Sequence, residues 1–508
     1  MFGKATEWSN DGEDKITYIL NFRRRNSRTL EAFAEAVDIE ARRFDAWCST
    51  REEEICYAQV RPTSVKEPLV VSLLSLEKRV RDEFGTTFDT LKRTLEGVTE
   101  KASAFRRHHF TRSNISTIPI WDLTEVQSNV PPAVITTHLL NALLHAVREQ
   151  DLMGEIVVST TLMRVFSKSV EPVWSMIGSW IRDGMPIHDP STRGAPENGG
   201  GNSPTDIDDE FFIEDNEMPL LDPDSWAEGC TLKKDGSGVS QVLPVFVEHV
   251  AQDVLSAGKA VGLLRVLGGD FQPGDVGDPC AALVDASIAW GQFEDLIRES
   301  NPGGEGEDAI MLPTSAEALS RIVYEDLHPR YLAAQQALTK VLLEDCELEY
   351  HLNVMEDCYF MRRGDVMNHF LDSLFAKMDS QQTWFDFHFL NSTFRDVVEM
   401  SYSRWIDPSL VRLSYQGSPD RADTRSVRGL DALFVEYAIP FPLTYICGPK
   451  AVQSYSAIFV LLAQIKRARS LLENTVLRGS GFVSRDVLRQ AEMKAFYALR
   501  NKLSWFVK

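Results

Sequence analysis

The sequence predicts an all-α fold. Through most of the chain, apolar residues recur at steps of three and four, as the buried face of a helix requires. Segments rich in glycine and proline interrupt this pattern and are typical of loops. Alternation typical of β-strands is confined to short segments near 411–443. Helices therefore carry the fold, and strands are a minor addition.

The first helical region is expected from Asp14 to about Arg107. Within it, Leu30, Phe33, Ala34, Val37 and Ala41 follow helical spacing and predict one buried face. A proline-containing break at Asn129–Pro132 ends this region, and helical patterns resume after it up to Phe166.

The stretch from Phe166 to Gly268 organises the rest of the chain. A helix should begin near Ser169 as its N-cap, because Pro172 fits only in the first turn of a helix. Trp180 lies on its apolar face, and Gly184 followed by a proline should end it. A glycine-rich segment near 189–209 predicts a flexible loop insertion.

A second helix is expected over Pro244–Gly268. Its apolar residues step by three and four and predict a narrow buried seam. Gly258 and Gly262 lie beside that seam, where the absence of a side chain would let another backbone approach closely. The seam residues are Val247, Val250, Val254, Ala257, Val261 and Leu264.

Later in the chain, helices are expected from Ser315 to about Met378, and short strands at Val411–Tyr415 and within Leu433–Leu443. Two helices follow. The last residues, from Leu503 on, are apolar and carry no helix stop signal, which predicts that the natural chain continues beyond Lys508. The expected buried faces are Tyr455, Ile458, Leu462, Ile465, Ala468 and Leu472 in the first helix, and Val487, Ala491, Ala495 and Ala498 in the second.

The chain is strongly acidic, with a formal net charge of −21 over 508 residues. Nucleic acid and anionic membranes bind proteins through clustered lysine and arginine, so neither is expected as the main partner of this acidic chain. A partner with a basic surface is compatible with this charge, as is simple solvation. Seven scattered cysteines, the lack of a signal segment and the lack of an apolar run of membrane-spanning length predict a reduced, intracellular protein without membrane insertion.

No motif predicts catalysis or a cofactor. The nucleophile elbow, the zinc-protease helix and the dinucleotide and phosphate loops are absent from the sequence. An enzyme with dispersed catalytic groups stays open, although nothing favours it. Two groups of potential metal ligands occur close together in the sequence, and neither has the ligand spacing of calcium loops or zinc sites. They are Asp206, Asp208, Asp209 and Glu210 for calcium, and Cys346, His351, Cys358 and His369 for zinc.

A series of motifs, in a fixed order, resembles the gamma-tubulin complex component family, which includes spindle pole body components. Each motif is an apolar packing pattern, and together they cover the chain from about Leu69 to the end. The residues that carry the resemblance are Pro172, Trp180, Gly184, Glu210, Phe211, Phe212, Ile213, Gly258, Lys259, Asp365, Phe370, Tyr437 and Pro442.

This resemblance implies elongated, stacked helical bundles in two halves. Residues 1–380 would form the N-terminal half, which makes lateral contacts with sibling components, and 381–508 would begin the half that binds gamma-tubulin. It further implies a role in templating microtubule nucleation at a microtubule-organising centre or spindle pole body, in the cytoplasm. The loop insertions suggest a non-core member similar to component five or six. The alternative is a generic helical adaptor, such as a vesicle-tethering subunit without tubulin binding.

Overall fold

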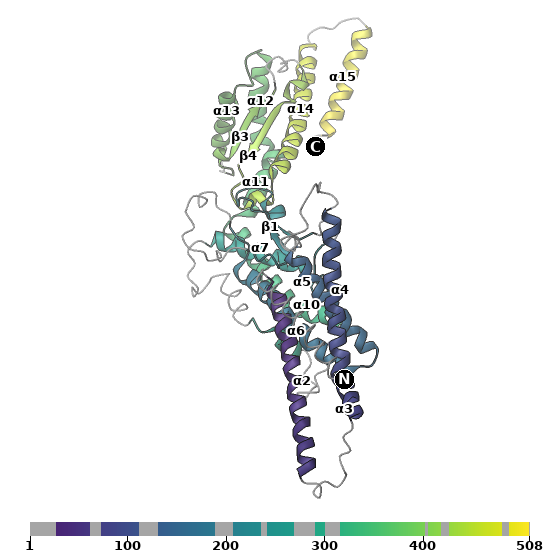
Figure 1. The fold of residues 1–508 in the computed structure, drawn as a ribbon. Coiled ribbons are helices and arrows are strands. Elements are labelled where there is room, and N and C mark those ends of the chain that lie inside the picture. Colours follow the sequence, from purple (N-terminus) through teal and green to yellow (C-terminus); the bar gives the residue numbers. More distant parts are fainter. Residues whose placement is uncertain are drawn as a thin grey trace, which may run out of the picture. The chain divides into compact units, whose positions relative to one another are not determined.

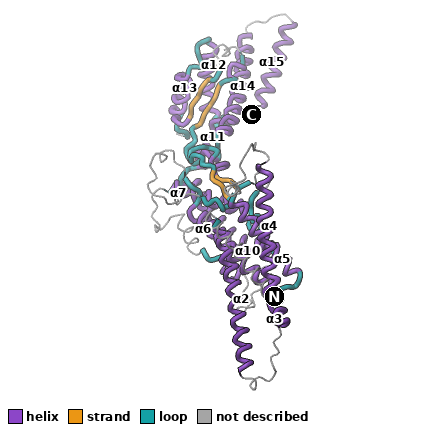
Figure 2. The backbone as a smooth tube through the Cα atoms, viewed as in Figure 1, coloured by secondary structure: helices purple, strands orange, loops and turns teal. Residues whose placement is uncertain are grey.

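The computed structural model describes residues 27–60, 73–110, 131–187, 207–234, 241–268, 290–299, 315–401, 405–417, 426–479 and 487–506. These residues are mainly helical, and two small antiparallel sheets are the strand structure that they contain (Figures 1 and 2). The predicted all-α class is confirmed. The expected loop insertion near 189–209 lies outside the described residues, except for its last three positions.

The chain folds into two compact units. Unit 1 consists of Met1–Leu220 and Trp226–Thr339, and unit 2 of Leu221–Ser225 and Lys340–Lys508. The division falls about forty residues before the boundary expected near 380. The reason is that residues 348–379 form two helices whose apolar side chains belong to the core of unit 2.

In unit 1, one long helix, α6, contacts most of its neighbours: α2, α4, α5, α7 and α9 (Figure 1). Its apolar residues supply much of the core, from Val158 to Ile181. The elements that lie wholly or mostly in this unit are α2 (Arg28–Val60), α3 (Leu73–Val80), a π-helical turn η1 (Arg81–Gly85), α4 (Thr86–Phe110), α5 (Pro132–Leu152), α6 (Ile156–Asp183), β1 (Ile213–Asp215), a π-helical turn η4 (Ser225–Gly229), β2 (Cys230–Leu232), α7 (Ala251–Leu267), α9 (Phe293–Glu299) and α10 (Ala316–Glu344).

Helix α6 begins thirteen residues before the predicted N-cap, so the expected start at Ser169 is wrong. Pro172 lies inside the helix. Ser169 is fully buried, and its hydroxyl donates a hydrogen bond of 2.6 Å to the carbonyl of Val165 instead of capping a helix start. Burial continues on both sides of the proline, so tertiary packing outweighs the local cost of one missing N–H. The predicted end at Gly184 is confirmed.

Helix α7 is shorter than expected, because residues 245–250 form turns and the helix begins at Ala251. Every residue of the predicted seam is buried. The seam is not narrow, however, since Leu255, Ala260 and Leu263 are buried as well. Apart from Gln252 and Arg265, which are exposed, the helix is buried nearly all round, as a helix inside a core is.

The core of unit 2 surrounds a two-stranded antiparallel sheet in which β3 (Val411–Tyr415) pairs with β4 (Leu433–Tyr437). Both strands lie in the segments where the alternating pattern predicted strands, and their pairing is a finding of the structure. Helices α13 and α14 contact β3 and β4 respectively, and α11 packs against α14. The remaining elements are α11 (Leu348–Tyr359), α12 (Gly364–Asp379), α13 (Phe387–Met400), α14 (Pro449–Gly479), α15 (Val487–Phe506) and the 3₁₀ turns η5 (Pro408–Leu410), η7 (Val427–Leu430) and η8 (Leu443–Tyr445).

At the centre of this sheet, Leu413 of β3 lies opposite Val435 of β4. Side chains bind the outward backbone groups of both residues. The Asn391 amide accepts from the N–H of Leu413 (3.0 Å) and donates to its carbonyl (2.8 Å). On the other edge, the hydroxyl of Ser456 accepts from the N–H of Val435 (2.9 Å), and the hydroxyl of Tyr359 donates to its carbonyl (3.2 Å).

The buried faces expected for the last two helices are wrong. In α14 the expected residues Tyr455, Ile458 and Leu462 are only half-buried, and in α15 Ala491 and Ala495 are exposed. The buried stripe of α14 is shifted to neighbouring positions because it must contact β4, η7 and α11 on one side. That stripe consists of Val452, Ser456, Phe459, Val460, Ala463 and Arg467.

Candidate functional site

The crossing of α6 and α7 brings together three of the residues that carry the family resemblance: Trp180, Gly258 and Gly184. The indole N–H of Trp180 donates to the backbone carbonyl of Val254 (2.8 Å). Its ring lies directly over Gly258, where a Cβ atom would come within 2.1 Å of the indole nitrogen. Only a glycine fits beneath this ring, so the two residues form a matched pair.

One turn further along α7, the chain after α6 touches the helix backbone. Gly184 has a φ of +72°, and a Cβ there would lie 2.3 Å from the amide nitrogen of Gly262. The N–H of Met185 donates to the carbonyl of Gly258 (2.9 Å), and a Cβ on Gly262 would collide with Met185. The close backbone approach expected at Gly258 and Gly262 is confirmed, and it locks the end of α6 onto α7.

Glu210 completes the N-terminus of α2 from far along the chain. Its carboxylate accepts from the N–H groups of Arg28 (2.8 Å) and Thr29 (3.3 Å), from the hydroxyl of Ser27 and from that of Thr136 (3.0 Å). Ser27 in turn accepts from the N–H groups of Leu30 and Glu31, through its hydroxyl and its carbonyl. The N–H groups of Arg28, Thr29 and Leu30, which a helix start leaves without a backbone acceptor, are therefore satisfied, and the bond from Glu31 to the Ser27 carbonyl is the first bond of the helix itself.

This carboxylate is 2% exposed. Burial raises the pKa of Glu210, while the hydrogen bonds from Ser27 and Thr136 oppose that rise. The group joins α2, α5 and the segment before β1, so it acts as a structural connector. Asp208, a member of the acidic cluster considered for calcium, accepts from the backbone N–H of Glu210 (3.1 Å), and Asp206 lies outside the described residues.

Phe211, Phe212 and Ile213 follow Glu210 directly and are all buried. The ring of Phe211 lies 6.2 Å from that of Trp180, which places it beside the crossing of α6 and α7. Ile213 opens β1 and pairs with Leu232 of β2 in an antiparallel hairpin that the sequence did not predict. Its three-residue strands are too short for an alternating pattern to show.

Lys259 is buried on α7, and its ammonium donates to the carbonyl of Trp226 (2.7 Å) within the π-helical turn η4. Burial lowers the pKa of Lys259, and the nearby Cys230 thiol opposes that effect. The same burial raises the pKa of Cys230 to about 12, so this cysteine stays a protonated thiol. The pair has the properties of a packing contact, and the cysteine is not activated as a nucleophile.

Pro172 lies half-buried near an aromatic cluster that sequence reasoning missed. Trp174 stacks on Trp290 with ring centroids 4.6 Å apart, and its N–H donates to the carbonyl of Gly291 (3.1 Å). Gly178 admits the ring of Trp290, because a Cβ there would come within 2.6 Å of it. The sequence hint to this cluster is Gly178, a small residue one turn after Trp174. The ring that Gly178 admits, that of Trp290, lies more than one hundred residues later in the chain.

In unit 2 the remaining four resemblance residues do not form one cluster. Asp365 is exposed in the first turn of α12, where a carboxylate suits the positive helix end. Phe370 is buried against Phe394 with ring centroids 5.6 Å apart. Tyr437 ends β4, and Pro442 follows a cis peptide bond and precedes η8.

The hydroxyl of Tyr437 lies 2.7 Å from the Nδ1 atom of His351, one of the four side chains considered for zinc. Another of them, Cys358, is fully buried, which raises the pKa of its thiol to about 12. Among the described residues, no three His, Cys, Asp or Glu side chains are arranged to hold a metal ion. Within the same described residues, no helix combines the length and the apolar character of a membrane span.

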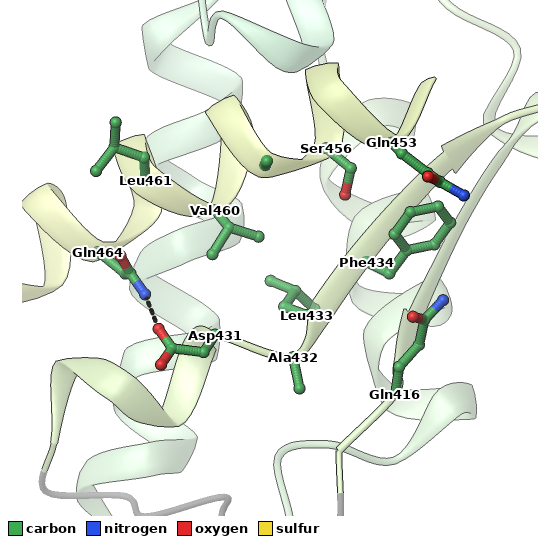
Figure 3. A pocket seen from close by; sticks show the side chains of 11 residues that line it. Gln416, Asp431, Ala432, Leu433, Phe434, Gln453, Ser456, Val460, Leu461 and Gln464 are labelled. Atoms are coloured by element: carbon green, nitrogen blue, oxygen red, sulfur yellow. Dashed lines mark hydrogen bonds between the residues drawn. The ribbon is translucent and has the colours of Figure 1, made fainter. Parts of the chain in front are cut away.

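Unit 2 also contains a pocket of about 460 Å³ between α14 and the start of β4 (Figure 3). The side chain of Gln464 bonds the carboxylate of Asp431 at one end, and Gln416, Gln453 and Phe434 lie at the other. Leu433 and Val460 lie between the two ends, and Ser456 already bonds the N–H of Val435. The side chains that line this pocket are amides, one carboxylate, the hydroxyl of Ser456 and apolar groups, and that hydroxyl is held by the backbone of β4.

Comparison with known proteins places these features in a family. The family model described as the gamma tubulin complex component N-terminal region matches residues 14–345, and the corresponding C-terminal model matches residues 348–508. The chain belongs to the gamma-tubulin complex component family. The two matches meet within a few residues of the division between the two compact units.

Individual relatives in this family are distant. Gamma-tubulin complex component 5 of Macaca fascicularis is 23% identical over 431 residues, which covers 69% of this chain and 58% of the relative. The mouse protein of the same name is 22% identical, with 69% and 41% coverage. Human gamma-tubulin complex component 4 is 21% identical over 155 residues, or 27% of this chain and 23% of the relative. The alignments thus span about half the length of the component 5 proteins.

Proposed function

We propose that the protein is a structural component of a gamma-tubulin complex that helps to template microtubule nucleation. The observation that carries the proposal is the pair of family matches, which cover the chain in order from residue 14 to its last residue. The buried polar groups support a non-catalytic role, since Glu210 and Lys259 bind backbone groups and helix ends in the packing of unit 1.

The proposal divides the work between two regions. The N-terminal region would assemble laterally with sibling components, and the C-terminal region would begin the part that binds gamma-tubulin. The sequence boundary of this division was expected near 380; the ends of the family matches at 345 and 348 favour an earlier one. The place of action would be the cytoplasmic cytoskeleton at a microtubule-organising centre or spindle pole body, and the similarity to component 5 proteins favours a non-core member.

Immunopurification of the tagged full chain from cells tests this proposal. We expect gamma-tubulin and sibling components among the recovered proteins, identified by mass spectrometry, and co-sedimentation of the tag with gamma-tubulin in a gradient. The same purification is repeated with a disruptive variant, Gly258→Leu, and compared with the unaltered chain. This variant should disturb the α6–α7 crossing and reduce the recovery of siblings if unit 1 makes the lateral contacts.

The proposal fails if neither gamma-tubulin nor a sibling component accompanies the chain in either experiment. Recovery of membrane-trafficking proteins in their place would favour the alternative, a helical adaptor or vesicle-tethering subunit. A microtubule nucleation assay then separates assembly from activity, because removing the chain from a purified complex should lower the number of microtubules formed per unit time.

A further inference from the structure

The turn between α5 and α6 exposes several apolar side chains. Leu152, Met153, Ile156 and Val157 are exposed by 79, 65, 68 and 60% respectively. They lie within six consecutive residues around a tight turn, and this group is here called the hairpin tip. Other exposed apolar residues such as Leu74 stand on single helices. Isolated exposed apolar residues need no explanation, whereas clusters of this kind mark interaction surfaces.

The hairpin tip is held by backbone hydrogen bonds. The N–H of Met153 donates to the carbonyl of Glu149 (3.1 Å), that of Gly154 to Asp151 (3.0 Å) and that of Glu155 to Gln150 (3.0 Å). Gly154 has a φ of +79°, which a residue with a side chain would adopt only with strain. Behind the tip, α5 and α6 pack against each other along the hairpin. A binding partner would therefore meet a preorganised surface and lose little conformational entropy in ordering it.

The charges around the tip indicate the kind of partner. Glu149, Asp151 and Glu155 are exposed beside the apolar side chains, and Arg148 is the basic residue in this segment. An acidic rim disfavours an anionic membrane. It also disfavours a second copy of this chain, which would bring the same rim and a net charge of −21.

We propose that the hairpin tip is a binding surface for a partner protein whose own surface carries an apolar pocket rimmed by lysine and arginine. The apolar side chains would fill the pocket, where interface energy concentrates in a few well-packed residues. The acidic rim would orient the encounter and make it sensitive to salt. This inference does not require that the chain bind gamma-tubulin.

Photo-crosslinking in cells tests the proposal on the full chain. p-Benzoylphenylalanine replaces Met153 in one version and Leu74, which is 77% exposed on α3, in the matched control. We expect one dominant protein adduct from position 153 that position 74 does not give. The crosslinked peptide, located by mass spectrometry, should contain apolar residues flanked by lysine or arginine.

Binding of that purified partner then completes the test. Leu152→Ser with Ile156→Ser should weaken binding about tenfold or more, and Tyr57→Ser with Leu74→Ser should leave it unchanged. Glu149→Lys with Glu155→Lys should also weaken it, without altering an apolar side chain. An adduct with a second copy, with lipid or with an acidic segment would overturn the proposal. Equal adducts from both positions would also overturn it, as would partner binding that is equally strong in the unaltered chain and in the variants of the hairpin tip.

Discussion

The fit between Trp180 and Gly258 predicts a specific non-additivity in stability. Trp180→Ala removes a buried indole and its hydrogen bond to Val254, and it should destabilise unit 1 by about 3–5 kcal/mol. Gly258→Ala places a methyl group where the indole nitrogen would lie 2.1 Å away. Overpacking of this kind costs about 1–3 kcal/mol, and the higher helix propensity of alanine offsets about 1 kcal/mol of it.

The double variant should reverse the sign of the second change. Without the indole, the methyl group of Gly258→Ala occupies part of the cavity and keeps its helix propensity. It should then be neutral or stabilise by up to about 1 kcal/mol. The expected coupling energy between the two sites is therefore about 1–3 kcal/mol.

The measurement is urea unfolding of the full chain, with hydrogen exchange of the α7 amides as a local report, because two units can unfold separately. Gly97→Ala is the matched control: Gly97 lies in α4, and a Cβ there would meet nothing within 4 Å, so it should be neutral or slightly stabilising. Effects at Trp180 and Gly258 that add within about 0.5 kcal/mol would refute the reasoning.

Three further predictions concern polar groups. Because burial lowers the pKa of Lys259 below 10.5, the folded chain binds fewer protons than the unfolded one, so stability should rise with pH between the lowered pKa and 10.5; unfolding of Lys259→Met should lack this rise, and parallel curves would contradict it. Glu210→Ala should cost about 2 kcal/mol or more and speed hydrogen exchange in the first turn of α2; unchanged exchange there would remove the capping role. Asn391→Ala should cost about 1–3 kcal/mol and expose the amide of Leu413, whereas equal protection of that amide in both proteins would argue against the contact.

Periodicity in the sequence was informative where a single element decides its own structure. It located β3 and β4, the end of α6 at Gly184 and the close approach at Gly258, because glycine and alternation act locally. It failed at Pro172, where packing on both sides of the proline maintains one continuous helix. In α14 it chose the wrong face, since the buried side depends on where β4 and α11 lie.

The contacts that define the candidate site are mostly non-local. Glu210 caps a helix that begins 182 residues earlier, and Trp290 enters a space left by Gly178 on a helix more than one hundred residues away. A motif can point to the residue, but one sequence without a structure cannot name its partner. The buried Arg467 is a similar case: its guanidinium reaches Asp379, 88 residues earlier, and an isolated arginine in a helix pattern is expected at the surface.

The small sheet of unit 2 has a consequence for how this unit can be recognised. At the central pair of β3 and β4, the backbone groups that a third strand would use are already bound by Asn391, Ser456 and Tyr359. Strand addition there would have to displace three side chains, two of them buried. A protein that approaches the central pair of this sheet therefore meets side chains instead of free backbone groups, and the same contacts oppose edge-to-edge pairing of two copies at that pair.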